Sequence, residues 1–335
     1  MKRITKIDTP ISFVSYAAVG GYEEKRGPLG DKFDFCDPSD KFGQKTWEIA
    51  ESEMGRIALN TALSKAKLSH EDIGLLVAGD LQNQCVASSG GLNSFGIPFV
   101  GVYGACSTCT ESLMTLSAFM SSSPDLTLGA VVTTSHNAAA ERQFRTPIEY
   151  GGQRAKTAQW TSTAGGAFIL QRERGEVEIS EYMPGRIIDG AIADGSNMGG
   201  AMAFAAADTV LNYFYESGES PSNIDYIVTG DLGKVGSDIL RELLAKEITG
   251  VERLHTDCGL LLYDFNEQDA HSGASGCGTS ASVLAAHFLP LLRDGRLRNI
   301  LFLSTGALMS PSSLLQGENI FGVAPLIRLK STNGE

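Results

Sequence analysis

The stretch Ile73-Gly-Leu-Leu-Val-Ala-Gly-Asp80 has a near copy later in the chain, Ile224-Asp-Tyr-Ile-Val-Thr-Gly-Asp231. Each is a short apolar run that ends in Gly-Asp. A short apolar run next to turn residues is typical of a strand buried in a parallel sheet. We therefore interpret the two runs as equivalent strands of a duplicated α/β unit.

The segments that follow these two strands also recur in the same order. A helix is predicted to begin at Cys106 in the first copy and at Cys277 in the second. Buried strands are predicted after these helices, at Leu126 to Thr134 and at Asn299 to Thr305. The shared order of elements favours duplication over a chance likeness of two strands.

The repeat divides the chain into two similar halves. We predict an α/β fold with one half over 1–185 and the other over 186–335, and 335 residues fit two units of ordinary domain size. Residues 137–166 are polar and are predicted to form an inserted loop region in the first half. A loop of that length in a compact domain commonly has a functional role.

The composition excludes several classes of protein. The net charge is −12, whereas nucleic-acid binding needs clustered Lys and Arg, so no nucleic acid is expected as a partner. Six cysteines are too few for a disulfide scaffold of this length, which favours a reducing cytoplasm. Cys106 and Cys109 form a CxxC pair that has no second pair of metal ligands, so no metal site is expected. No segment has the pattern of a membrane span.

Cys106 is the first candidate for chemistry. It follows a predicted strand and Gly104-Ala105, and it opens a helix. A thiol at a helix N-terminus lies at the positive end of the helix dipole, which is expected to lower its pKa and suit it to nucleophilic attack. The alternative is that Cys106 is a small buried residue in a tight turn between a strand and a helix.

His271 is the second candidate. It begins the stretch His271-Ser-Gly-Ala-Ser-Gly276, which precedes a predicted helix. Small residues in such a loop allow a ligand to come close to the backbone. The position therefore suits a histidine that contacts a ligand.

The segment from Ser135 to Arg145 supplies a third group of candidates. It begins where a buried strand is predicted to end, which is where ligands bind in open α/β sheets. His136 and Asn137 can donate hydrogen bonds to a carboxylate, and Arg142 and Arg145 share a face if the segment is helical. Two such guanidinium groups can hold an anion. The alternative is a solvated basic face paired with nearby glutamates.

The two halves, the sequence Gly104-Ala-Cys-Ser-Thr108 at the start of a helix, and the Gly/Ser-rich loop at His271 together resemble the thiolase superfamily. This superfamily includes thiolases and ketoacyl-acyl carrier protein synthases. The resemblance covers nearly the whole chain. It implies a duplicated thiolase-like fold of five layers, αβαβα, and a homodimer.

A closer resemblance rests on longer segments spread along the chain. These are Ile11-Ser-Phe-Val14, Gly27-Pro-Leu-Gly-Asp31, Gln44-Lys-Thr-Trp-Glu48, Gly101-Val-Tyr-Gly-Ala-Cys-Ser-Thr108, Thr134-Ser-His-Asn137, Glu141-Arg-Gln-Phe-Arg145, Tyr150-Gly-Gly152 and Ala270-His-Ser-Gly-Ala-Ser-Gly-Cys277. They are similar to the family of stage V sporulation protein AD.

That second resemblance implies a role in sporulation. A member of this family is expected to bind dipicolinic acid (pyridine-2,6-dicarboxylate), as the free acid or as its calcium chelate, and to support its uptake into the developing spore. No further cofactor is implied. The resemblance implies membrane proteins of the same uptake system as partners, and a cytoplasmic location that is peripheral at the forespore or spore inner membrane.

The chain also departs from the condensing enzymes that it resembles. Ketoacyl synthases of this type place a histidine after the strand that corresponds to Tyr226 to Thr229, where this chain has Gly230-Asp231. Cys106 is therefore kept without that acid/base partner, and such proton transfer contributes orders of magnitude to a rate. We expect a binding protein whose ligand contacts are Cys106, His136, Asn137, Arg142, Arg145, Asp231 and His271.

Two other functions stay open. A condensing or transfer enzyme for acyl thioesters would be acylated on Cys106 and would use His271 as its base. A scaffold that docks membrane partners would bind no small molecule in the pocket.

Overall fold

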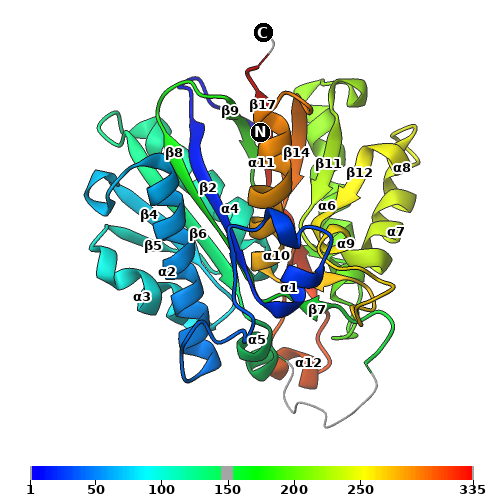
Figure 1. Cartoon of the computed structure of the whole chain (residues 1–335). Coiled ribbons are helices and arrows are strands. Elements are labelled where there is room, and N and C mark those ends of the chain that lie inside the picture. Colours follow the sequence, from blue (N-terminus) through cyan, green and yellow to red (C-terminus); the bar gives the residue numbers. More distant parts are fainter. Residues whose placement is uncertain (1, 145–153, 334–335) are drawn as a thin grey trace.

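The computed structural model of this chain describes residues 2–144 and 154–333. In this part of the chain, twelve strands form one mixed sheet, whose main path runs β12-β11-β14-β17-β9-β2-β8-β6-β4-β5 (Figure 1). The first-half strands are β2 (Ser12–Gly20), β4 (Leu75–Gly79), β5 (Phe99–Gly101), β6 (Leu128–Ser135) and β8 (Ala164–Gln171). The other side of the sheet consists of β9 (Val177–Met183), which still belongs to the first half of the sequence, and the second-half strands β11 (Tyr226–Thr229), β12 (His255–Asp257), β14 (Asn299–Leu303) and β17 (Leu326–Ser331).

The strand order is symmetrical about the contact between β2 and β9. On the first-half side β4 is parallel to both β5 and β6, while β8 is antiparallel to both β6 and β2. The second-half side repeats this pattern around β11 and β17. β2 and β9 meet through one residue pair, Ser12 and Glu178. The duplicated α/β arrangement is confirmed, and the division after residue 185 stays a prediction. β9 precedes that division and lies beside the second-half strands.

The helices add three layers to the two sets of strands, as Figure 1 shows. α2 (Trp47–Ala66) and α3 (Val86–Leu92) cover the outer face of the first-half strands. α6 (Met198–Ser217) and α7 (Gly233–Leu244) cover the second half. Between the two sets of strands lie α4 (Thr108–Ser122) and a continuous helical run made of α10 (Cys277–Val283), the π-helical η7 (Leu284–Phe288) and α11 (Leu289–Arg293). This is the expected five-layer arrangement, αβαβα.

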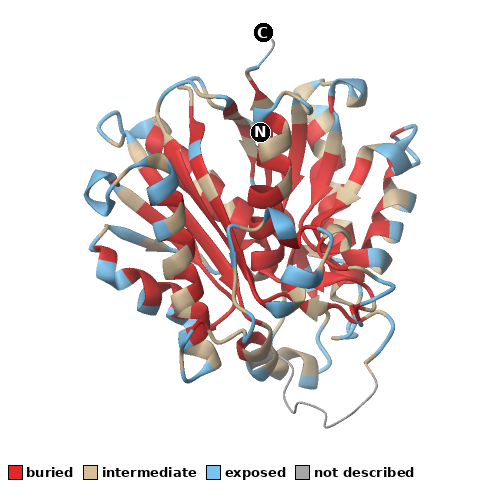
Figure 2. Cartoon of the chain, in the orientation of Figure 1, coloured by how far each residue is buried: buried red, intermediate tan, exposed pale blue. Residues whose placement is uncertain are grey.

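In the central layer every residue of α10 is buried, as Figure 2 shows, and α4 buries one of its faces. Leu113, Leu116 and Met120 of α4 are fully buried in one apolar cluster with Val283 and Phe288. Each such side chain contributes about 1.5–3 kcal/mol relative to exposure. The two Cys-led helices are therefore held rigidly, and their N-termini present fixed backbone groups to the site.

The remaining described elements are short. They are β1 (Thr5–Lys6), α1 (Tyr22–Arg26), η1 (Gly30–Lys32), β3 (Phe35–Cys36), η2 (His70–Asp72), η3 (Asn83–Cys85), η4 (Asn93–Phe95), η5 (Ala105–Ser107), α5 (Asn137–Phe144), β7 (Trp160–Thr161), β10 (Ile188–Asp189), η6 (Pro221–Asn223), α8 (Val251–Leu254), α9 (Cys258–Leu261), β13 (Ala274–Ser275), β15 (Gly306–Leu308), α12 (Pro311–Leu315) and β16 (Phe321–Val323). The region 137–166 thus begins with α5 and contains β7.

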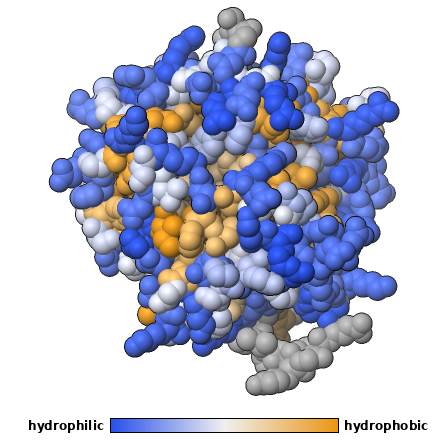
Figure 3. Space-filling view, in the orientation of Figure 1, coloured by the Kyte–Doolittle hydropathy of each residue, from blue (hydrophilic) through white to orange (hydrophobic). Residues whose placement is uncertain are grey.

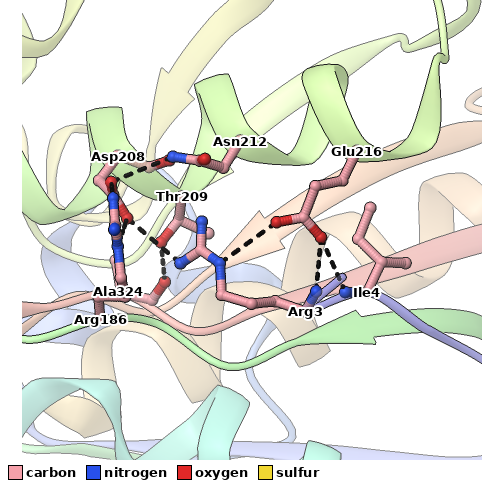
Figure 4. Close-up of polar contacts among 8 residues, drawn as sticks. All are labelled: Arg3, Ile4, Arg186, Asp208, Thr209, Asn212, Glu216 and Ala324. Atoms are coloured by element: carbon pink, nitrogen blue, oxygen red, sulfur yellow. Dashed lines mark hydrogen bonds and ion pairs between the residues drawn. The ribbon is translucent and has the colours of Figure 1, made fainter. Parts of the chain in front are cut away.

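Polar contacts fasten the N-terminal segment to α6 (Figure 4). The Glu216 carboxylate accepts hydrogen bonds from the backbone N–H groups of Arg3 and Ile4, at 2.5 and 3.3 Å. The Arg3 guanidinium pairs with Glu216 at 3.4 Å and with Asp208 at 3.3 Å. Asp208 also pairs with Arg186. These contacts hold the first residues of the chain against the outer layer of the second half.

The face shown in Figure 3 is largely hydrophilic, with apolar residues gathered mainly between α2 and α10. Within the described ranges 2–144 and 154–333, no helix is long and apolar enough to cross a membrane.

Candidate functional site

The candidate site lies at the carboxyl ends of strands β4, β6, β11 and β14. The Gly-Asp repeat has a packing reason here. A Cβ on Gly79 would lie 2.0 Å from the Val102 carbonyl oxygen, and one on Gly230 would lie 3.0 Å from Ser304 Cα. Glycine lets the chain pass these neighbours, and the next residue, Asp80 or Asp231, is fully buried.

Cys106 lies in the short helix η5, one turn before α4. Its side chain is buried, and its Sγ lies 3.9 Å from Ser275 Oγ. The preceding residue, Ala105, has a φ of 54°, a left-handed conformation that costs a residue with a Cβ about 1–2 kcal/mol. Strain of this kind persists only where surrounding structure enforces it, and it is common at functional sites.

The expected lowering of the Cys106 pKa is wrong. The pKa of the thiol is raised well above its usual value, first by burial and then by the nearby Asp231 carboxylate. Both effects oppose a thiolate, because burial penalises charge and a neighbouring negative charge repels another.

Asp231 connects the parts of the site. Its carboxylate accepts hydrogen bonds from Gly276 N at 2.8 Å, Thr305 Oγ1 at 2.9 Å and Ser275 Oγ at 3.3 Å. Burial raises the pKa of Asp231 to about 6, although hydrogen bonds, including one with Cys106, act in the other direction. Gly276 has a φ of 104°, a conformation that favours glycine, and this turns its N–H toward Asp231.

A small cavity of about 40 Å³ lies against Cys106. Its lining residues are Leu81, Ala105, Cys106, Ala140, Glu141, Thr161, Met198, Ser275, Ala307 and Met309. They come from both halves of the chain and from α5 and β7 of the 137–166 region. The walls are mainly apolar, with two hydroxyl groups and one carboxylate.

The structure places His136 and Asn137 where the sequence predicted, directly after a strand, but neither lines this cavity. The His136 ring is buried, its Nε2 lies 2.8 Å from the Asp40 carbonyl oxygen, and Trp47 packs against it. Burial lowers the pKa of His136. Asn137 Nδ2 donates to the Thr161 carbonyl oxygen at 3.0 Å, so Asn137 supports a lining residue.

The other predicted contacts lie further out. Arg142 is exposed and pairs with Glu48 at 3.0 Å, rather than with a neighbour in its own segment. Arg145 lies outside the described residues. His271 pairs through Nε2 with Asp269 at 2.8 Å, and its Nδ1 lies 2.8 Å from the Ala155 carbonyl oxygen. Among the predicted ligand contacts that are described, Cys106 and Asp231 are the two that the structure brings together.

Sequence reasoning missed most of the cavity wall. Two lining residues, Glu141 and Ser275, lie inside the family-like stretches Glu141–Arg145 and Ala270–Cys277 and could have been named from them. The Glu141 carboxylate accepts a hydrogen bond from Thr161 Oγ1 at 3.3 Å. Met198 and Met309 gave no signal, because each is a single methionine in a segment without a recognisable pattern. Only the folded chain places them beside Cys106.

Comparison with solved structures defines the class of fold. The 3-oxoacyl-[acyl-carrier-protein] synthase III of Aquifex aeolicus VF5 is similar with a TM-score of 0.58 and 13% identity, over 95% of this chain and 99% of that one. Xanthomonas campestris OleA with bound cerulenin is similar with a TM-score of 0.60 and 15% identity, over 96% and 100%. The protein therefore has the thiolase-like fold of the ketoacyl synthases.

Sequence comparison then gives the family. The model of the family "Stage V sporulation protein AD (SpoVAD)" matches residues 1–330. Stage V sporulation protein AD of Bacillus subtilis (strain 168) is 40% identical over 323 residues, which cover 96% of this chain and 95% of that protein. The chain belongs to the stage V sporulation protein AD family.

Proposed function

We propose that this protein binds dipicolinic acid, as the free acid or as its calcium chelate, in the cavity at Cys106, and so supports its uptake into the developing spore. Membership of a sporulation protein family supports this role. One observation favours binding over catalysis: Cys106 lies beside a carboxyl group and not beside an imidazole.

The five histidines of the chain all have contacts away from Cys106. His70 packs on Phe95, His136 contacts Asp40, His255 contacts Thr229, His271 pairs with Asp269, and His287 contacts Lys32. A condensing reaction needs a thiolate and a group that moves protons. Burial and Asp231 keep the thiol protonated, so the geometry does not favour the enzyme alternative with His271 as its base.

The chemistry of the cavity suits an uncharged, flat ligand. Among its described lining residues, the one charged side chain is Glu141, which is acidic. A free dianion would be repelled by Glu141 and by Asp231 behind Cys106, whereas a 1:1 calcium chelate carries no net charge. Leu81, Met198 and Met309 offer apolar and thioether surfaces that pack well on an aromatic ring. We therefore expect the chelate to bind more tightly than the free acid.

Calorimetry with dipicolinate, with and without calcium, tests this proposal. Binding to the wild type with a preference for the chelate is expected, and Cys106→Ala should weaken it by removing part of the wall. Cys109→Ala is the matched control, because Cys109 lies three residues further along, in α4, and is fully buried in the central core. Absence of binding in both conditions would exclude the proposed ligand and leave the condensing enzyme and the scaffold, which acylation of Cys106 by a thioester would then distinguish.

Glu141→Gln tests the charge argument. It should improve binding of the free acid and leave binding of the chelate unchanged or weaker, because the chelated calcium then loses a negative neighbour. His136→Ala and His271→Ala should have little effect, since both side chains lie outside the lining. A large loss of affinity in either variant would place the ligand elsewhere.

We also propose that two copies pair through β5, an edge strand on which Phe99 is exposed. Such an edge can pair with another strand. Light scattering should show a dimer for the wild type and a monomer for Phe99→Lys. The proposed location is the cytoplasmic side of the forespore or spore inner membrane, bound to membrane proteins of the uptake system, and co-purification with membranes tests it.

A further inference from the structure

Two hollows meet at the turn that carries Cys106. The inner one is the cavity of about 40 Å³, and the outer one is a groove of about 340 Å³. Ala105, Ala307 and Met309 line both. Ligand pockets are commonly about 300–1,000 Å³, so the inner cavity alone is too small for an aromatic dicarboxylate. A ligand bound at Cys106 must therefore gain space, and the groove is the adjoining space.

The segment that forms the shared wall is fixed at both ends and exposed in the middle. A Cβ on Gly306 would lie 2.6 Å from the Gly104 carbonyl oxygen, and one on Gly322 would lie 2.8 Å from the Ala201 carbonyl oxygen. Both glycines therefore pack directly on neighbouring backbone. Between them α12 lies at the surface, where Leu315 is 88% exposed. Displacement of the middle would disturb few buried contacts.

Met309 lies where this segment leaves the core. Residues 301–307 are buried, Met309 is half-buried, and Ser310 is exposed. Among the described residues, three line both hollows; Ala105 and Ala307 have only a methyl side chain, so Met309 is the one of these three that can move a bulky group. An unbranched thioether changes rotamer easily and adapts to a ligand.

We propose that Met309 is the barrier between the groove and the Cys106 cavity, and that it determines which ligands reach Cys106. This inference rests on the proposed function, in which the ligand binds at Cys106. Rotation of Met309 joins the two hollows and admits a planar ring. The matched comparison is Met198, which lines the inner cavity but not the groove.

Modification of Cys106 by methyl methanethiosulfonate measures access directly, with peptide mass spectrometry to separate Cys106 from the other cysteines. Met309→Ala should increase the modification rate about fivefold, because the barrier becomes a methyl group. Met198→Ala enlarges the cavity without opening it and should change the rate less than twofold. Leu315→Ala, on the same segment but outside both linings, should leave it unchanged. Thermal unfolding shows whether each variant is folded.

Protection by the calcium chelate of dipicolinate separates this inference from the proposed function. Protection of Cys106 in the wild type, together with faster modification only in Met309→Ala, supports both. Faster modification in Met309→Ala without protection by the ligand retains the barrier and contradicts the proposed function. If Cys106 is modified at equal rates in Met309→Ala and Met198→Ala while the ligand still protects it, the barrier role of Met309 is overturned and the proposed function stands.

Discussion

Asp80 and Asp231 occupy equivalent places in the two halves and have different partners. Both follow a glycine at the end of a strand, and both are fully buried. The Asp80 carboxylate accepts from Gln82 N at 2.8 Å, Ser88 N at 2.7 Å and Ser88 Oγ at 2.5 Å. These donors all lie within the next eight residues of the chain. Asp80 therefore closes a local turn.

Asp231 reaches donors that are 44 to 74 residues away, namely Ser275, Gly276 and Thr305, and it meets Cys106 from the other half. The same two-residue motif thus organises one loop in the first half and the whole site in the second. A repeat in sequence indicates equivalent positions in a fold, whereas the role of each copy depends on what the rest of the chain brings to it.

The largest effect is expected for Asp231→Ala. It leaves Gly276 N and two hydroxyl groups without their acceptor in a buried place, which should cost about 3 kcal/mol of unfolding free energy. Urea denaturation measures this loss. Asp231→Asn keeps an acceptor and should lose less, while removal of the charge should lower the pKa of Cys106, seen as faster alkylation at pH 9. A loss smaller than that of Asp80→Ala would contradict the comparison.

Asp80→Ala should cost about 2 kcal/mol, because donors from one local loop can turn partly toward water once the carboxylate is gone. The same urea experiment gives the value. Cys106 alkylation serves as the second readout and should stay at the wild-type rate, since the partners of Asp80 are local. A change in that rate as large as that of Asp231→Asn would mean that the two acids share one role.

The pH dependence of the unfolding free energy distinguishes acids that are buried from acids that pair with arginine. Burial raises the pKa of Asp231 to about 6 and that of Asp257 to about 7. A carboxyl group with a raised folded pKa stabilises the protein fully below its unfolded pKa, near 4, and this stabilisation is lost as pH rises through 6 to 7. Asp257→Asn should therefore reduce the loss of stability between pH 5 and pH 8 by on the order of 1 kcal/mol. An unchanged slope would show that Asp257 does not titrate in this range.

The smallest effect is expected for the half-buried acids of α6 that pair with arginines. Desolvation acts to raise the pKa values of Asp208 and Glu216, but both are lowered overall. Arg186 and Arg3 lower the pKa of Asp208, and the backbone N–H groups of Arg3 and Ile4 together with the Arg3 guanidinium lower that of Glu216. Their stabilisation is present above their unfolded pKa values and is lost as pH falls through the lowered ones. Arg3→Ala should cost less than about 1 kcal/mol at neutral pH, and less again at high salt. A salt-independent loss would indicate packing rather than charge.

The fold was predictable because its signals are local. The apolar runs became β4 and β11, and the Cys-led segments became α4 and α10, so the order of elements alone indicated duplication. The end of α2 is also set locally, because Lys67 adopts a left-handed conformation and caps the helix. The single bridge from Ser12 to Glu178 has no local signal, because strand pairing across the middle of the sheet depends on both halves.

The site was predictable only in part, for the same reason. Cys106 and Asp231 lie in motifs whose neighbours along the chain define them. The shift of the Cys106 pKa was predicted in the wrong direction, because the burial of the thiol and the nearby Asp231 charge arise from tertiary structure. His271 looked suited to the site, yet a positive φ of 48° and its pairing with Asp269 keep it outside the cavity. Helix position and loop composition describe a residue's backbone, and its side-chain environment is set by distant segments.

The place of β17 in the sheet has a consequence for biosynthesis. β17 (Leu326–Ser331) lies between β14 and β9 in the sheet. β2, which is made early, can pair with β8 only after β8 has been synthesised. At about 5–20 residues per second, a ribosome needs on the order of 20 to 70 s for the chain. β9 is complete at Met183 and β17 at Ser331, so β9 lacks this neighbour for somewhat less than half of that time, and unpaired strand edges favour aggregation. A nascent chain that stops before β17 therefore exposes two edges in the middle of the sheet, so the second half can complete its fold only after translation has reached that strand.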